Sequence, residues 1–156
     1  MDTVVKINYS VYWKILILYM KDFLYCIWAI PANHHPWYTD TGGFCPHLSI
    51  NTNLSYEEAY AEFTKIEFLP ILVTLDTVIY EYTEEFSSLF YTVSSTPPPP
   101  WFPNGAHISF IYKYSGAFSA LNIARIGSIA KNGVLDRICV VRCNGHYNTW
   151  EILHIR

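Results

Sequence analysis

The chain has 156 residues, of which 51% are hydrophobic and 15% are charged, and its formal net charge is -3. This length and apolar content predict a single domain over residues 1–156, and they exclude a disordered chain. The slight negative charge argues against a protein that coats long nucleic acid, because such proteins neutralise phosphates with clustered lysines and arginines. A small nucleotide remains an allowed partner.

The N-terminal region is rich in apolar side chains but is interrupted by charges. Val11–Met20 predicts an early core strand or helix, and Leu24–Ile30 predicts a central strand. No uncharged apolar run reaches the roughly 18 residues of a membrane span, so we expect no membrane segment and a cytoplasmic protein. The alternative is a secretory signal cleaved near Ala32, although Lys21 and Asp22 interrupt its apolar region.

The stretch from 32 to 44 predicts a loop, because it contains a proline, an asparagine, an aspartate and a Gly-Gly pair. His34 and His35 are adjacent, so on an extended backbone their side chains point apart and a shared metal is disfavoured. Two roles are possible for the Trp37 side chain. An aromatic ring on a loop is suited to stack on a nucleobase, and the alternative is that it covers the edge of the core.

A predicted strand over Phe44–Ile50 carries the first of two short repeats. Residues His47–Ile50 read histidine, apolar, serine, apolar, and His107–Phe110 repeat this order 60 residues later. Because side chains alternate along a strand, each histidine shares a face with the serine two residues on, and the apolar residues point to the core. Two such strands side by side would place two imidazoles and two hydroxyls around one spot.

Each repeat is followed by a predicted helix. After the first repeat, Asn51–Leu54 predicts a turn and Ser55–Phe68 predicts a helix, whose Ser-x-x-Glu opening is that of a capping box. A second helix is predicted over Ser115–Ala130, with Lys131–Gly133 as its C-cap. The predicted core-facing stripe of the first helix consists of Tyr56, Ala59, Tyr60 and Phe63.

Further strands are predicted where β-branched and aromatic residues gather. They are Ile71–Thr83, Leu89–Ser95, His107–Tyr114, Arg137–Cys143 and Trp150–Ile155, the last two forming a hairpin across Asn144–Gly145. Thr96–Gly105 contains four consecutive prolines, which hold the chain extended. We expect a stiff loop with Trp101 on the rim of the site, and the alternative is a ligand for an SH3 or WW domain.

The four cysteines contain no Cys-x-x-Cys pair, which favours reduced thiols in a cytosolic protein. One combination would bring four zinc-type ligands together, but its spacing matches no structural zinc site. That combination is Cys139, Cys143, His146 and His154. We therefore expect neither a metal nor another cofactor.

The two histidine–serine repeats resemble the paired motifs of the 2H phosphoesterases, the LigT-like phosphodiesterases. The resemblance extends from about Phe23 to the C-terminus and includes the helix after the first motif and the closing hairpin. It implies an α+β fold that is internally duplicated and two-lobed, with antiparallel sheets and flanking helices around a central cleft. It also implies a metal-independent phosphodiesterase for a cyclic or 2′,5′-linked nucleotide. Examples are a cyclic dinucleotide such as cGAMP, or 2′,5′-oligoadenylate, which viral and phage members degrade to counter immune signalling.

The residue types of the two repeats permit this chemistry. A neutral histidine takes a proton from water or a ribose hydroxyl, and a protonated one supplies the leaving oxygen, so the rate should have a bell-shaped dependence on pH. Serine hydroxyls stabilise charge on the phosphate oxygens. Which histidine is the base is left open. The predicted catalytic residues are His47, Ser49, His107 and Ser109, and the predicted substrate-binding residues are Lys113, Tyr112, Trp37 and Trp101.

Strand alternation makes a finer prediction for the second repeat. If no bulge intervenes, Lys113 shares the face of His107, and Tyr112 points to the opposite face. Three alternatives for the function stay open. A lone histidine on a strand is commonly a hydrogen-bonded structural residue, and only the second copy favours a site. Within the phosphodiesterase class the alternative is RNA-end processing at 2′,3′-cyclic phosphates. Outside that class it is a module that binds a nucleotide without cleaving it. In each case we expect a monomer.

Overall fold

The computed structural model describes residues 24–40, 45–82, 87–113, 120–143 and 149–156. The predicted element over Val11–Met20, the Ser115 start of the second helix, the Asn144–Gly145 turn and the zinc candidate His146 lie outside these residues. The strands are β1 (Tyr25–Ile30), β2 (His47–Leu54), β3 (Ile71–Tyr82), β4 (Ser87–Ser94), β5 (His107–Lys113), β6 (Asn132–Leu135), β7 (Arg137–Arg142) and β8 (Glu151–Ile155). The helices are α2 (Pro36–Asp40), α3 (Tyr56–Lys65) and α4 (Ala120–Gly127).

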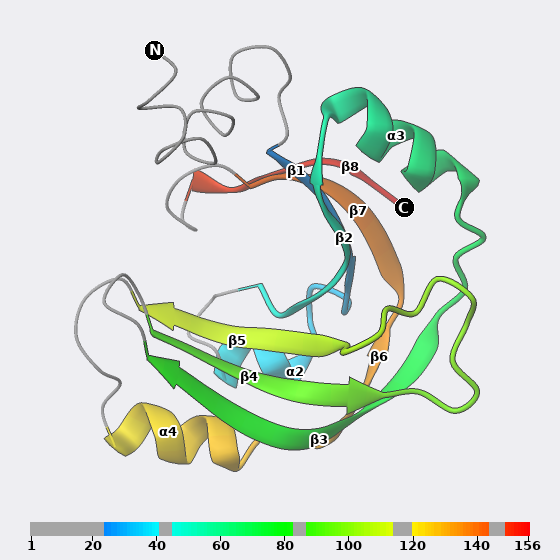
Figure 1. The fold of residues 1–156 in the computed structure, drawn as a ribbon. Helices are drawn as coiled ribbons and strands as arrows, with labels where there is room; N and C mark the ends of the chain where they lie inside the picture. The colour runs from blue at the N-terminus through cyan, green and yellow to red at the C-terminus, as the bar shows by residue number, and fades with distance from the viewer. Residues whose placement is uncertain (1–23, 41–44, 83–86, 114–119, 144–148) are drawn as a thin grey trace, which may run out of the picture.

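The described strands form one antiparallel sheet in the order β6-β3-β4-β5-β2-β1-β7-β8, curled into a half-barrel (Figure 1). The predicted two-lobed α+β fold with flanking helices is therefore wrong. The physical reason is that the two motif strands pair directly, with His47 opposite Ser109 and Leu48 opposite Ile108. This ladder joins the two groups of strands into a continuous sheet, and it places β2 and β5 at the centre.

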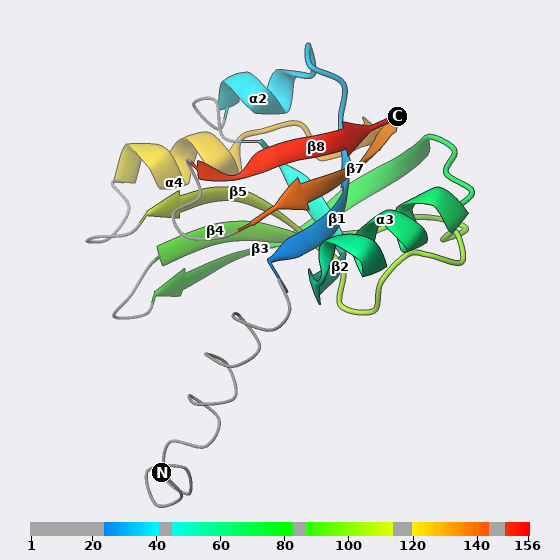
Figure 2. The same cartoon turned by 90° about the horizontal axis from the view of Figure 1, so that it is seen from above.

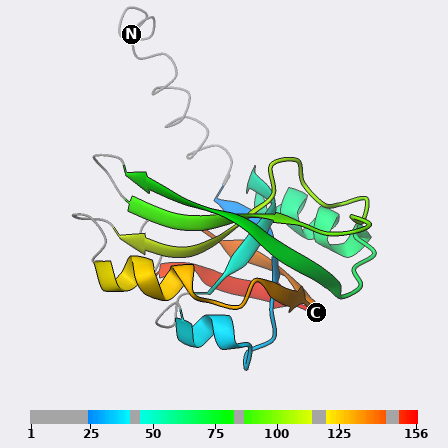
Figure 3. The same cartoon turned by 90° about the horizontal axis from the view of Figure 1, so that it is seen from below.

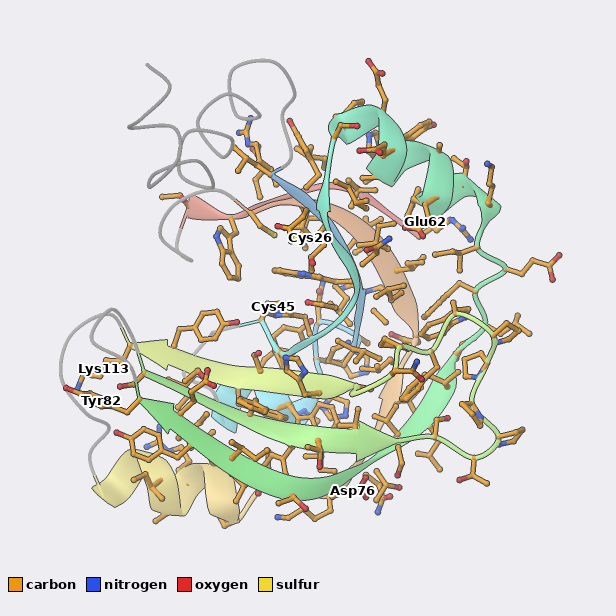
Figure 4. All side chains as sticks on the ribbon, viewed as in Figure 1. Cys26, Cys45, Glu62, Asp76, Tyr82 and Lys113 are labelled. Carbon is orange, nitrogen blue, oxygen red and sulfur yellow. The ribbon has the colours of Figure 1, made fainter. Side chains whose placement is uncertain are left out.

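Strand alternation gives the sheet an inner and an outer face. The outer face carries fully buried Ile27, Leu48 and Ile108 and packs against the helices. Figure 2 shows α3 lying along β1 and β2 on this side. The inner face looks into the curl and carries Cys26 and His47, and Figure 4 labels Cys26 and Cys45 there. The large apolar core thus supports the motif strands from behind.

Helix α3 begins as the sequence predicts. The Ser55 hydroxyl accepts a hydrogen bond from the backbone N–H of Glu58 at 3.1 Å, and the Glu58 carboxylate accepts one from the N–H of Ser55 at 2.9 Å. This capping box is the one that the Ser-x-x-Glu spacing indicates. Of the predicted stripe, Ala59 and Phe63 are buried, whereas Tyr56 and Tyr60 are exposed. The core-facing stripe is narrower than predicted because both tyrosine rings pack against the surface residue His154 instead.

Three short segments differ from the predicted elements because tertiary packing overrides local turn signals. Residues 36–40 form α2, not a loop, since Trp37 anchors this turn in the core. Asn51–Leu54 continues β2 and pairs with β1, where a turn was predicted. Lys131–Gly133, predicted as a C-cap, leads into β6, which pairs with β3. Helix α3 also ends at Lys65, earlier than predicted.

Gly133 is tightly packed against Trp37, and Gly133→Ala is expected to lower the free energy of unfolding by about 1–3 kcal/mol. A Cβ atom at Gly133 would lie 2.4 to 3.0 Å from three atoms of the Trp37 ring. The ring cannot easily move away, because it is fully buried and its Nε1 donates to the carbonyl oxygen of Ala130 at 2.9 Å. Figure 3 shows α2 beside the segment that follows α4, where this bond is made.

Urea unfolding of the two proteins measures this loss. Gly127→Ala is the matched control, since nothing lies within 4 Å of a Cβ at that position. Equal stability of the Gly133→Ala and Gly127→Ala proteins would show that the sheet accommodates the methyl group.

Candidate active site

The two motif histidines lie on neighbouring central strands and on the same face of the sheet. His47 of β2 is opposite Ser109 of β5, and His107 precedes Ser109 by two residues, so alternation places all three side chains on the inner face. A diagonal pair of this kind has Cα atoms roughly 7–8 Å apart. The charge of His107 is one of the effects that lower the pKa of the His47 imidazole, which agrees with this placement. The repeats therefore meet side by side, as the sequence predicts.

Both imidazoles are held in the same way by the backbone. Nδ1 of His47 lies 2.8 Å from the carbonyl oxygen of Cys45, and Nδ1 of His107 lies 3.2 Å from that of Gly105. In each case the acceptor is two residues before the histidine. Because a carbonyl oxygen only accepts, Nδ1 carries the hydrogen in both rings, and proton exchange with a substrate falls to Nε2. The four-residue repeat is thus also a repeat of side-chain orientation.

His47 is enclosed by aromatic rings. It is 4% exposed, its ring stacks on Trp28 with centroids 3.7 Å apart and planes 11° apart, and Trp150 stands edge-on at 6.0 Å. Burial lowers the pKa of His47 to about 4, against the opposing effect of its bond to Cys45, and the nearby charge of His107 lowers it further. His47 is therefore a neutral imidazole at pH 7.

His107 has a different environment, although its strand is adjacent. It is exposed, its backbone pairs with Thr92 of β4, and the Phe90 ring lies 4.9 Å from its own. Only one of the two imidazoles is thus enclosed, and the pair is chemically asymmetric. The sequence repeats alone do not reveal this difference.

A bulge in β5 changes the predicted positions of Tyr112 and Lys113. Leu89 pairs with Ile111 and Phe90 with Ser109, so Phe110 has no partner in this ladder. Such an extra residue reverses the alternation beyond it. Tyr112 consequently shares the inner face, where its hydroxyl lies 3.4 Å from that of Ser109.

By the same alternation Lys113, the exposed last residue of β5, falls on the opposite face from Tyr112. Figure 4 labels it at the end of that strand. The bulge removes the condition of the finer prediction, so the two residues exchange the faces expected for an unbulged strand. Tyr112 lies beside Ser109, and a role for Lys113 in binding a substrate stays a prediction.

The motif serines line the same face as the histidines. Ser109 is 4% exposed beside His47, and Ser49 pairs with Trp28 of β1. Trp28 and Trp150 are functional neighbours that the sequence analysis did not identify. Trp28 was predicted to lie on a strand, but only the pairing of β1 with β2 shows that it faces the site.

Trp37 and Trp101 do not reach the histidines. Trp37 is fully buried in the outer core, where its ring meets Phe110 edge-on. Trp101 also packs on the outer core and lies 5.2 Å from the Phe68 ring. It lines a groove of about 900 Å³ beside the proline run, and none of the four motif residues lines that groove. The structure therefore does not bring either tryptophan beside the two histidines, and a role for them in binding a substrate stays a prediction.

Within the described ranges, no group of three or more His, Cys, Asp or Glu side chains is arranged to hold a metal ion. None of the described helices is long and apolar enough to cross a membrane. No family model, curated protein or solved structure matches the chain. A functional assignment therefore depends on the geometry of the inner face.

Proposed function

We propose that this chain is a metal-independent phosphodiesterase of the 2H type, which cleaves a small cyclic or 2′,5′-linked nucleotide through His47 and His107. The observation that supports it most is the equivalent placement of the two imidazoles. They extend from adjacent strands on one face, and each Nδ1 bonds the carbonyl two residues earlier. A single structural histidine needs no such counterpart.

The structure favours distinct roles for the two histidines. His47 is the general base, because its pKa of about 4 leaves the ring unprotonated at neutral pH, which is the state in which a base must start. His107, which is exposed, then acts as the acid that protonates the leaving oxygen. The hydroxyls of Ser109 and Tyr112 are close enough to share a phosphate oxygen and to stabilise its charge in the transition state.

Reaction requires that the inner face opens beside His47. With the ring 4% exposed, a phosphodiester reaches Nε2 only if the aromatic cover shifts, and Trp150 is the ring that stands edge-on there. The substrate is a small nucleotide, in keeping with the net charge of -3. We place the monomeric protein in the cytoplasm, where its four unbonded cysteines would stay reduced.

The same burial favours a second candidate function, a module that binds a nucleotide without cleaving it. A stacked imidazole with a satisfied Nδ1 is also what a structural histidine looks like. In that case the aromatic rings Trp28, Trp150 and Tyr112 would hold a base, and His47 would only support Trp28.

Incubation with a nucleotide panel in EDTA distinguishes these functions. The panel contains cyclic dinucleotides, 2′,5′-oligoadenylate and 2′,3′-cyclic nucleotides, and products are identified by mass spectrometry. Cleavage that persists in EDTA and is lost in both His47→Ala and His107→Ala supports the phosphodiesterase. Binding without product supports the module, whereas cleavage that EDTA abolishes would contradict the metal-independent reaction. Turnover of the 2′,3′-cyclic substrates alone would assign the protein to RNA-end processing.

A further inference from the structure

Two Asn-Gly dipeptides lie within the described part of the chain, and the fold places them in different environments. One is Asn104-Gly105, in the turn that leads into β5, and the other is Asn132-Gly133, at the start of β6. Asparagine is a thermolabile residue, and a following glycine increases this lability because no side chain shields its backbone nitrogen. Neither asparagine has a role in the proposed reaction.

The first dipeptide is open to solvent and to rearrangement. Asn104 and Gly105 are both exposed, and they lie in a turn outside the sheet. Gly105 has a φ of +66°, and a Cβ atom built there would meet nothing within 4 Å. The Asn104 side chain can therefore turn toward the next backbone nitrogen without displacing a packed neighbour. We propose that Asn104 is a site of spontaneous deamidation and that the fold protects Asn132.

The second dipeptide is held by strand pairing and by packing. Asn132 is opposite Thr74 in the ladder of β6 with β3, and its Oδ1 accepts a hydrogen bond from the Thr74 hydroxyl at 3.1 Å. Gly133 is buried and packs so closely on the Trp37 ring that a Cβ atom there would clash with it. Ring closure between the Asn132 side chain and the Gly133 nitrogen would turn the backbone out of its extended conformation. It would thus break the pairing with β3.

Deamidation at Asn104 needs only water as a co-reactant. The backbone nitrogen of Gly105 loses its proton and attacks the side-chain carbonyl carbon of Asn104. The C–N bond of the amide breaks, and the departing nitrogen takes up a proton and leaves as ammonia, which gives a cyclic succinimide. Water then opens the ring at either carbonyl and produces aspartate or isoaspartate. Overall, an amide and a water become a carboxylic acid and ammonia.

The modified turn lies directly before the second motif histidine, so an effect on activity rests on the proposed function. The carbonyl oxygen of Gly105 is 3.2 Å from Nδ1 of His107 and is the acceptor that orients this ring. In isoaspartate the backbone runs through the side-chain carbon, which lengthens the chain by a methylene group immediately before Gly105. The acceptor is thereby displaced from Nδ1. We expect the isoaspartate form to have a lower kcat while the sheet stays folded.

Peptide mapping of the full chain tests the site. The protein is aged in mildly alkaline buffer at body temperature, and mass spectrometry follows both Asn-Gly peptides over time. The Asn104 peptide should gain the mass difference between an amide and an acid and should separate into aspartate and isoaspartate forms. Its conversion should be faster at higher pH, because the attacking nitrogen must lose a proton. The Asn132 peptide should stay unchanged over the same period.

The same ageing in concentrated urea is the control for the fold. In the unfolded chain both peptides should convert at similar rates, since both have the sequence Asn-Gly. Conversion of Asn132 as fast as Asn104 in the folded protein would overturn the proposal. So would a folded protein whose Asn104 is intact when the unfolded chain has already converted.

Asn104→Gln separates the modification from its effect on His107. Glutamine forms the corresponding cyclic imide far more slowly, so the aged variant should keep its activity while aged wild type loses activity in proportion to the converted fraction. Asn144-Gly145 lies outside the described residues, but it is present in both proteins and does not affect this comparison. Full conversion of Asn104 with unchanged activity would overturn the link to His107. The peptide map requires no turnover, so failure of the proposed phosphodiesterase is a separate result.

Discussion

His47→Gln and His107→Gln are each expected to lower kcat/KM for the cleaved nucleotide by about 10²–10⁴-fold, the usual contribution of a positioned acid or base. Glutamine retains a polar side chain of similar reach but cannot exchange a proton at neutral pH. The two rings act on opposite sides of one phosphodiester. The kcat/KM of the double variant should therefore be only slightly lower than that of the less active single variant. Initial rates with the substrate identified in the nucleotide panel measure these ratios.

His154→Gln is the matched control for the two glutamine variants. His154 is half-buried on β8, and its Nε2 lies 2.7 Å from the Tyr56 hydroxyl on the α3 side of the sheet, so its loss should leave kcat/KM unchanged. Full activity in His47→Gln would show that His47 takes no part in the reaction and is a structural residue.

The pH profile separates the two histidines further. The acidic limb of the plot of kcat/KM against pH reports the pKa of the base in the free enzyme. Its midpoint should therefore lie near pH 4, where His47 becomes protonated. His107→Gln should keep this limb at a lower rate, and His47→Gln should lose it. An acidic limb above pH 6 in the wild-type protein would mean that His47 is not the base.

Those parts of the fold that depend on neighbouring residues could be predicted from the sequence. The alternation of His47 to Ile50 and of His107 to Phe110 indicates two strands with a polar and an apolar face, and both strands are present. The capping box at Ser55 is likewise a local signal, since both of its hydrogen bonds lie within four residues. In these places the residues that carry the signal are also the residues that form the structure.

The parts that depend on strand pairing could not be predicted. Direct pairing of β2 with β5 makes one curled sheet where two lobes were expected, and no local pattern encodes that contact. The unpaired residue Phe110 reverses the faces of Tyr112 and Lys113, and nothing in its residue type marks it as the position of a bulge. Trp28 reaches the site only because β1 lies beside β2. Trp37 is buried in the core because of long-range packing, which its own segment does not indicate.

Burial of His47 should also make the fold sensitive to acid. The wild-type free energy of unfolding is expected to fall by about 3 kcal/mol between pH 7 and pH 4 on account of this ring alone. The folded-state pKa of about 4 lies below the reference value of 6.5, so in this window the unfolded chain binds the proton and the folded chain does not. Stability is therefore complete above pH 6.5, is lost progressively as the pH falls, and levels off below pH 4.

Carboxylates also titrate in this range, so the informative quantity is the difference in pH dependence between wild type and His47→Gln. Urea unfolding at pH 7 and pH 4 should show a drop in the wild type that is about 3 kcal/mol larger than the drop in His47→Gln. His107→Gln keeps the enclosed ring and should keep most of the wild-type drop. Equal drops in wild type and His47→Gln would mean that the His47 ring takes up its proton without leaving the fold. The stack on Trp28 would then tolerate an imidazolium, and the base assigned to the proposed reaction would already be charged in mild acid.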